Sequence, residues 1–93
     1  MIRDFIDRDV EGLFHGRLSK RLPPDIQRSA QRKLRLLHQA LELRDLLAPP
    51  GNRLEALKGD RAGQHSIRIN GQWPICFVWR DGGAERVEIV DYH

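Results

Sequence analysis

The N-terminal segment joins a short apolar stretch to a short helical repeat. Residues 1–6 predict an opening strand. Apolar residues three and four apart then predict a first helix, whose buried face comprises Val10, Leu13 and Phe14. We expect Asp7 or Asp9 to cap this helix and Gly16 to end it, because an aspartate side chain accepts hydrogen bonds from the free amides of a first turn.

The longest periodic segment runs from Pro24 to about Leu47. Its apolar residues are three to five apart and predict one helix face, comprising Ile26, Ala30, Leu34, Leu37, Leu41 and Leu46. The opposite face is polar and carries Arg28, Arg32, Arg35 and Gln39. Pro24 suits a first helical turn, and the prolines of APPGN end the helix, because proline cannot continue the ladder of backbone hydrogen bonds.

Beyond Gly51 the helical spacing gives way to the alternation typical of strands. The stretches that predict strands are RLEAL, HSIRI, WPICFVW and AERVEIVDYH. They are separated by the turn-rich loop KGDRAGQ and by the hairpin signals NGQ and RDGG. Pro74 has no backbone N–H, so we expect the third of these strands to start at an edge or a bulge.

The two tryptophans of this strand, Trp73 and Trp79, share a face with Ile75 and Phe77. We interpret them as core residues rather than as a base-stacking platform. Because helices and strands are segregated along the chain, the sequence predicts an α+β fold. We expect an N-terminal strand, two helices and an antiparallel meander of about four strands, with the helices covering one face of the sheet and residues 1–93 forming a single domain.

Charge and hydropathy restrict the partners. The formal net charge is +3, and nearly all positive residues are arginines, whose planar guanidinium matches phosphate oxygens. This permits a nucleic-acid partner without requiring one, since arginine-rich soluble proteins are common. The N-terminus is charged throughout, and no apolar run approaches the roughly 20 residues that cross a bilayer. We therefore expect a cytoplasmic protein with no membrane partner.

Three kinds of chemistry find no pattern in the sequence. His15, His38, His65, His93 and Cys76 show no zinc-ligand spacing, so we expect no metal. Cys76 lies between apolar residues in a predicted strand, which raises a thiol pKa and disfavours nucleophilic catalysis. The loop KGDRAGQ lacks the spacing and the ending of a phosphate-binding nucleotide loop, and no other cofactor is implied.

The remaining polar candidates gather in the sheet half. They are Glu55, Lys58, Arg61, Arg68, Asp91, Tyr92 and His93. Neighbouring strands could bring them to one end of the sheet. Such a set can cleave RNA without a metal: a carboxylate takes the 2′-hydroxyl proton, cations stabilise the phosphorane, and an imidazolium protonates the departing 5′-oxygen.

Simpler interpretations of these residues stay open. Glu55 and Lys58 could form a solvated ion pair at a strand end. Tyr92 could serve packing alone, and a terminal histidine can be disordered. The acid role nevertheless suits His93, because its own α-carboxylate favours the imidazolium form.

The string RLEALKGDRAGQHSIRINGQW, followed by an apolar strand and the terminal VEIVDYH, resembles the HigB toxins of the RelE/ParE superfamily. The opening MIRDF and the block ELRDLLAPPGNRLEALKGDRAGQHSIRI are especially similar to the GraT-type branch. The resemblance covers essentially the whole chain. Its pattern LKGDRxGxxSIxxNxxW, with DYH at the end, is highly specific.

This resemblance implies a microbial-RNase-like fold and a ribosome-dependent, metal-independent endoribonuclease. Such toxins cut mRNA in the ribosomal A site through a 2′,3′-cyclic phosphate and inhibit translation. The implied partners are a HigA-type helix-turn-helix antitoxin, the ribosome with its mRNA, and operator DNA indirectly through the antitoxin. The family's functional positions correspond to Lys58, for phosphate or transition-state binding, and to Asp91, Tyr92 and His93. By similarity to YoeB-type toxins, Glu55 is the general base and His93 the acid.

One position departs from the family pattern. Where the family reads Trp-Arg, with the arginine on the scissile phosphate, this chain has Pro74. Losing one such donor typically costs roughly 10²–10³-fold in rate. Either Arg61 or Arg68 compensates, or the protein is an attenuated toxin that acts mainly as an antitoxin-binding partner in operator autoregulation. Gyrase poisoning, as in ParE relatives, is a third alternative, disfavoured because it needs no terminal acid–base set.

Overall fold

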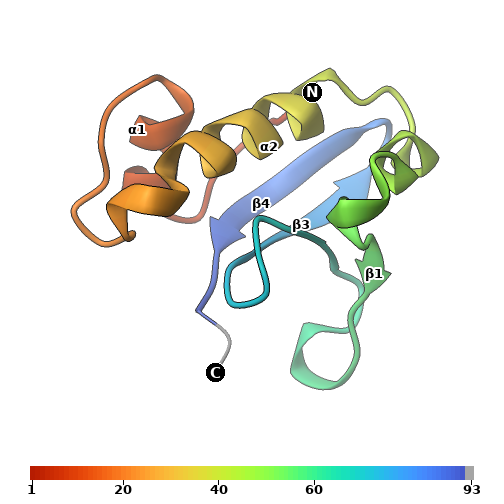
Figure 1. Cartoon of the computed structure of the whole chain (residues 1–93). Helices are drawn as coiled ribbons and strands as arrows, with labels where there is room; N and C mark the ends of the chain where they lie inside the picture. The colour runs from red at the N-terminus through yellow and green to blue at the C-terminus, as the bar shows by residue number, and fades with distance from the viewer. Residues whose placement is uncertain (92–93) are drawn as a thin grey trace.

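The computed structural model of the chain describes residues 1–91, and an antiparallel sheet lies at its centre (Figure 1). The strands are β1 (Glu55–Ala56), β2 (His65–Arg68), β3 (Pro74–Arg80) and β4 (Gly83–Ile89). Their order in the sheet is β1-β2-β3-β4, so each strand pairs with its neighbour in the sequence. The predicted meander and the α+β class are confirmed, although β1 is only two residues long.

Two α-helices cover one face of this sheet, as Figure 1 shows: α1 (Arg8–Phe14) and α2 (Gln27–Gln39). The N-cap of α1 is Asp7, whose side chain accepts a hydrogen bond from the backbone N–H of Val10 at 3.0 Å. Asp9, the other candidate for the N-cap, instead accepts a hydrogen bond from the hydroxyl group of Ser19. The capping interaction satisfies one of the free donors of the first turn.

The core lies between α2 and the sheet. Leu34 and Leu37 of α2 are fully buried, as are Ile67, Ile75 and Phe77 on the sheet. Trp73 is also buried and Trp79 packs against the same cluster, which confirms that both tryptophans belong to the core. Val87 and Ile89 are buried too, as expected for a last strand that is part of the packed sheet.

The prediction of one long helix from Pro24 to Leu47 is wrong beyond Gln39, in the last third of that range. A 3₁₀ turn, η1 (Pro24–Ile26), precedes α2, and the chain becomes extended at Ala40 before a second 3₁₀ helix, η2 (Leu43–Leu47). The side chain of Asp45 accepts hydrogen bonds from the N–H groups of Leu41 and Glu42 at 3.0 and 2.9 Å, which starts a new element. Leu41 is consequently 80% exposed, not buried on the α2 face.

The opening strand predicted for residues 1–6 is also not formed in full. Residues 1–6 form only two isolated parallel bridges to β4, Ile2 with Ala84 and Phe5 with Val87. Between these bridges the side chain of Asp4 accepts the backbone N–H of Arg86, which has a φ of 54°. This interruption keeps the segment from pairing continuously, so it lies along β4 without becoming a fifth strand.

Pro74 does not place its strand at the sheet edge. It is the first residue of β3, which lies between β2 and β4, and the irregularity in the β3–β4 pairing falls later, between Cys76 and Val78. A first strand position tolerates proline because the missing N–H is at the end of the ladder. Two further 3₁₀ turns, η3 (Pro50–Asn52) and η4 (Gly59–Arg61), flank β1. In the described chain, no helix has the length and hydropathy of a membrane span.

Candidate active site

The face of the sheet away from the helices carries a row of polar residues. The strand register pairs Glu55 with Ser66, Ser66 with Cys76, and Cys76 with Glu88. Directly paired residues in an antiparallel sheet lie on the same face. The intervening residues, among them Ile67, are buried in the core with α2. Cross-strand pairing therefore places one side chain from each of the four strands on the face that no helix covers, here called the open face, although Ser66 and Cys76 on it are themselves buried.

A hollow lies at one end of this face. It is lined by Arg53, Glu55, Ser66, Arg68, Asn70, Gly71 and Pro74. Arg68 pairs directly with Pro74, and it is two residues from Ser66 on the same face of β2. The structure thus brings together Glu55 and Arg68, two of the predicted site residues. It adds Arg53, which the sequence analysis missed and whose only signal was a positive charge two residues before Glu55.

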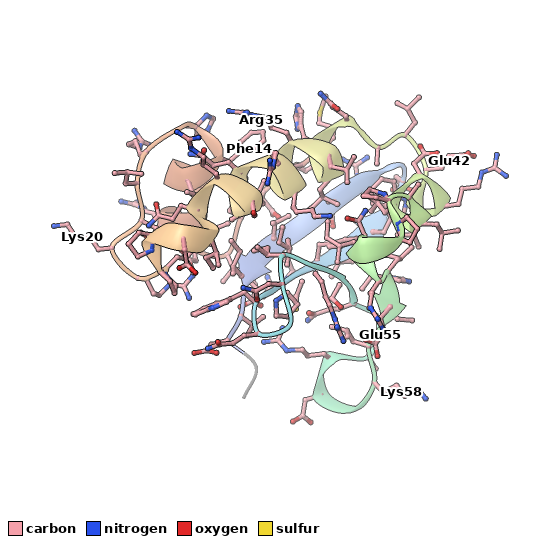
Figure 2. All side chains as sticks on the ribbon, in the orientation of Figure 1. Phe14, Lys20, Arg35, Glu42, Glu55 and Lys58 are labelled. Atoms are coloured by element: carbon pink, nitrogen blue, oxygen red, sulfur yellow. The ribbon has the colours of Figure 1, made fainter. Side chains whose placement is uncertain are left out.

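Lys58 does not line this hollow. It precedes η4 and is exposed, and in Figure 2 its side chain extends outward beside η4, with Glu55 on the neighbouring strand β1. Within the described chain no ion pair joins Glu55 to Lys58, so the interpretation of these two residues as a solvated ion pair is not supported. The exposed ammonium of Lys58 stays available to a partner that approaches from solvent.

Arg61 is held on the other side of the open face. Its guanidinium forms an ion pair with Glu88 at 3.2 Å and donates a hydrogen bond to the side chain of Gln64 at 3.0 Å. Glu88 is the cross-strand partner of Cys76. Burial raises the pKa of the Cys76 thiol to about 11, while Arg61 lowers it and Glu88 raises it. This agrees with the expectation that Cys76 is a buried residue and not a nucleophile.

Asp91, the last residue that the structure describes, is tied to the turn beside the hollow. The strand β4 ends at Ile89, so Val90 and Asp91 follow the strand instead of extending it as predicted. The backbone N–H of Val90 donates to the carbonyl oxygen of Pro74 at 3.1 Å, and the side-chain amide of Gln72 donates to Asp91 Oδ1 at 2.9 Å. Gln72 belongs to the turn whose Asn70 lines the hollow. Tyr92 and His93 lie outside the described residues.

The hollow therefore combines one carboxylate with two guanidinium groups. Glu55 supplies a proton acceptor, and Arg53 and Arg68 supply donors whose geometry matches phosphate oxygens. Ser66 and Asn70 add neutral hydrogen-bonding groups to the lining. Pro74 contributes an apolar ring to the wall, where an arginine would have contributed a third cation. The set is suited to binding a phosphodiester beside a general base.

Two helices on one face of a four-stranded antiparallel meander are consistent with the fold of a RelE-like toxin. Residues 3–93 match the HigB-like toxin family, described as the RelE-like toxin of the type II toxin–antitoxin system HigB. The chain belongs to this family.

Its curated relatives agree with that assignment. Toxin HigB-1 of Vibrio cholerae serotype O1 is 40% identical over 85 residues, which covers 90% of both chains. Endoribonuclease HigB of Proteus vulgaris is 33% identical over 98 aligned positions, which covers the whole of both chains. An uncharacterised protein of Haemophilus influenzae is 28% identical over 67 residues, covering 72% of this chain and 66% of that protein.

Proposed function

We propose that this protein is an endoribonuclease toxin that cleaves mRNA in the ribosomal A site and so inhibits translation. Membership of the HigB family and the name of the Proteus vulgaris relative support the nuclease activity. The observation that carries the proposal is the hollow, in which Glu55 faces the same space as Arg68. The hydrogen bond from Gln72 to Asp91 also supports it, because it ties the residue that precedes Tyr92 and His93 to the turn that lines part of the hollow.

In the proposed reaction Glu55 accepts the proton of the RNA 2′-hydroxyl. The freed oxygen attacks the adjacent phosphorus, and Arg68 and Lys58 stabilise the charge that gathers on the phosphorane. The bond to the 5′-oxygen breaks as His93 donates its proton to that oxygen, leaving a 2′,3′-cyclic phosphate. Tyr92 is assigned to stacking on a base. Each acid or base contributes about 10²–10⁴-fold in rate, and the scheme needs no metal.

The proposed partners follow from the type II family. A HigA-type helix-turn-helix antitoxin neutralises the toxin in the cytoplasm, and the complex binds operator DNA through the antitoxin. The substrate complex is the ribosome with its mRNA. The ribosome supplies part of the positioning, so we expect cleavage of naked RNA to be slow.

A second candidate function rests on Pro74. With an apolar ring in the wall of the hollow, the toxin could be attenuated and serve mainly as the antitoxin-binding partner in autoregulation. This alternative requires the fold and antitoxin binding but little catalytic activity.

The test is mRNA cleavage on programmed ribosomes, comparing wild type, deletion of His93, and Pro74→Arg. The endoribonuclease proposal expects A-site cleavage by the wild type and its loss on deletion of His93. An inert wild type with an active Pro74→Arg variant would instead favour the attenuated toxin. Cleavage that survives the deletion would remove His93 from the proposed mechanism.

A further inference from the structure

Arg53 enters the hollow from an unusual backbone conformation. Its φ is 45° and its ψ is 55°, the left-handed region that residues other than glycine rarely adopt. It follows η3 directly, and its backbone N–H donates to the carbonyl oxygen of Pro50 at 3.2 Å. A side chain at this position destabilises the fold relative to glycine, so its presence calls for a compensating role.

The preceding residue fixes this conformation. Asn52 is fully buried, and its side-chain amide donates to the carbonyl oxygens of Leu46 and Ala48 at 3.1 and 3.2 Å. Its own side-chain oxygen accepts the ammonium of Lys33 from α2. Asn52 thus ties the residue before Arg53 to η2 and α2. Backbone strain that the surrounding structure holds in place in this way is typical of functional sites.

The side chains that line the hollow carry one more positive charge than negative charge, so one bound anion would balance them. The described lining holds one carboxylate, Glu55, and two cations, Arg53 and Arg68. Neither arginine forms an ion pair with another described residue, whereas Arg61 is paired with Glu88. A phosphodiester carries a single negative charge and would neutralise this excess.

We propose that Arg53 is a phosphate-binding residue of the site. Together with Arg68 it holds the RNA phosphate beside Glu55, and it supplies the guanidinium that Pro74 does not. The inference rests on the proposed function, because it names how that site holds its substrate. It assigns the compensation for Pro74 to Arg53 and Arg68, and not to Arg61, which is engaged elsewhere.

The decisive variant is Arg53→Gly. Glycine adopts the left-handed conformation without strain, so the guanidinium is removed while the local backbone is preserved. We expect its melting temperature to equal or exceed that of the wild type, which separates loss of function from loss of folding. Arg35→Ala is the matched control, because it removes an exposed arginine from α2, on the helical side of the sheet (Figure 2).

Binding is measured with a short RNA carrying 2′-O-methyl groups, which cannot be cleaved, over a range of salt concentrations. We expect Arg53→Gly to weaken binding about 10-fold or more and to reduce the slope of log K against log salt by about 0.7, the value for one single-strand phosphate contact. Arg35→Ala should leave both unchanged. Equal affinity of Arg53→Gly and wild type would overturn the inference.

Cleavage on programmed ribosomes separates this inference from the proposed function. If the wild type binds the RNA through Arg53 but does not cleave, the proposed nuclease fails and the phosphate site stands. If the wild type and Arg53→Gly cleave equally well, the inference fails and the nuclease stands. A wild type that neither binds the RNA nor cleaves contradicts both.

Discussion

At the residue scale, single side chains on the open face have distinct roles that their identities alone do not reveal. Glu55 and Arg68 line the hollow, while Arg61 is paired with Glu88 beside Cys76. In the sequence Arg61 and Arg68 were equivalent candidates for phosphate binding, while Glu55 was the candidate base. Their separation follows from the register of the strands, which decides the neighbours that each side chain meets across the sheet.

Cys76 gives a pH prediction at this scale. The pKa of its thiol is about 11 in the folded protein, chiefly because of burial, against an ordinary value of 9.0. Between these values the unfolded chain loses a proton that the folded protein retains. The stabilising contribution of the Cys76 thiol to the free energy of unfolding is therefore fully present below pH 9. It is lost as the pH rises toward 11, and the free energy of unfolding falls by at most about 1.4 kcal/mol per pH unit.

Urea unfolding at pH values on either side of 9 measures this effect, with Cys76→Ala as the comparison. The other alkaline groups titrate in both proteins, so the difference between their slopes isolates the thiol. The same slope in both proteins would contradict the assignment of the raised pKa to Cys76.

At the element scale, the end of α2 shows how a local interaction overrides periodicity. Leucine spacing continues past Gln39, yet the helix ends there because Asp45 and Glu42 form a reciprocal capping box for η2. The hydrogen bonds that the backbone N–H groups of Glu42 and Leu41 donate to Asp45 also lower the pKa of its carboxyl group. The spacing of the apolar residues predicted that a helix exists here, but it did not predict that α2 ends at Gln39.

Two matched leucine substitutions test this reassignment. Leu34→Ala removes a fully buried side chain from α2 and should lower the free energy of unfolding by about 2–5 kcal/mol. Leu41→Ala removes an exposed side chain and should change it by less than about 0.5 kcal/mol. Urea denaturation followed by circular dichroism measures both changes. A large decrease in the free energy of unfolding for Leu41→Ala would show that Leu41 is buried in the core.

At the scale of the whole molecule, the candidate site is assembled from segments far apart in the sequence. The hollow combines the residue after η3, the strands β1 and β2 and the turn before β3. The hydrogen bond from Gln72 to Asp91 then ties this turn to the C-terminal segment. This hydrogen bond, the tether, holds Asp91, the last residue that the structure describes, against a turn that helps to line the hollow.

Loosening this tether should reduce catalysis without unfolding the protein. We expect Gln72→Ala to lower ribosome-dependent cleavage about 10-fold or more, since misplacing a catalytic group by about 1 Å can cost 10²-fold in rate. The melting temperature should stay unchanged, because the side chains of Gln72 and Asp91 are both exposed. Gln39→Ala is a control at an exposed glutamine. The double variant Gln72→Glu with Asp91→Asn should recover activity, because the asparagine amide can donate a hydrogen bond to the glutamate carboxylate. Full activity of Gln72→Ala would refute the role of the tether.

The sequence by itself determined the family, the α+β class, the antiparallel meander and most of the core. The family followed from the resemblance of the quoted motifs, whereas the class, the meander and the core depend on periodicity and turn chemistry, which neighbouring residues fix locally. It also selected Glu55 and Arg68, because their types suit phosphodiester chemistry. Only the tertiary structure decided that Arg53 lines the hollow, that Arg61 pairs with Glu88 and that residues 1–6 do not form a full strand. Those outcomes depend on strand register, on a left-handed backbone position and on hydrogen bonds between distant segments, none of which has a periodic signature along the chain.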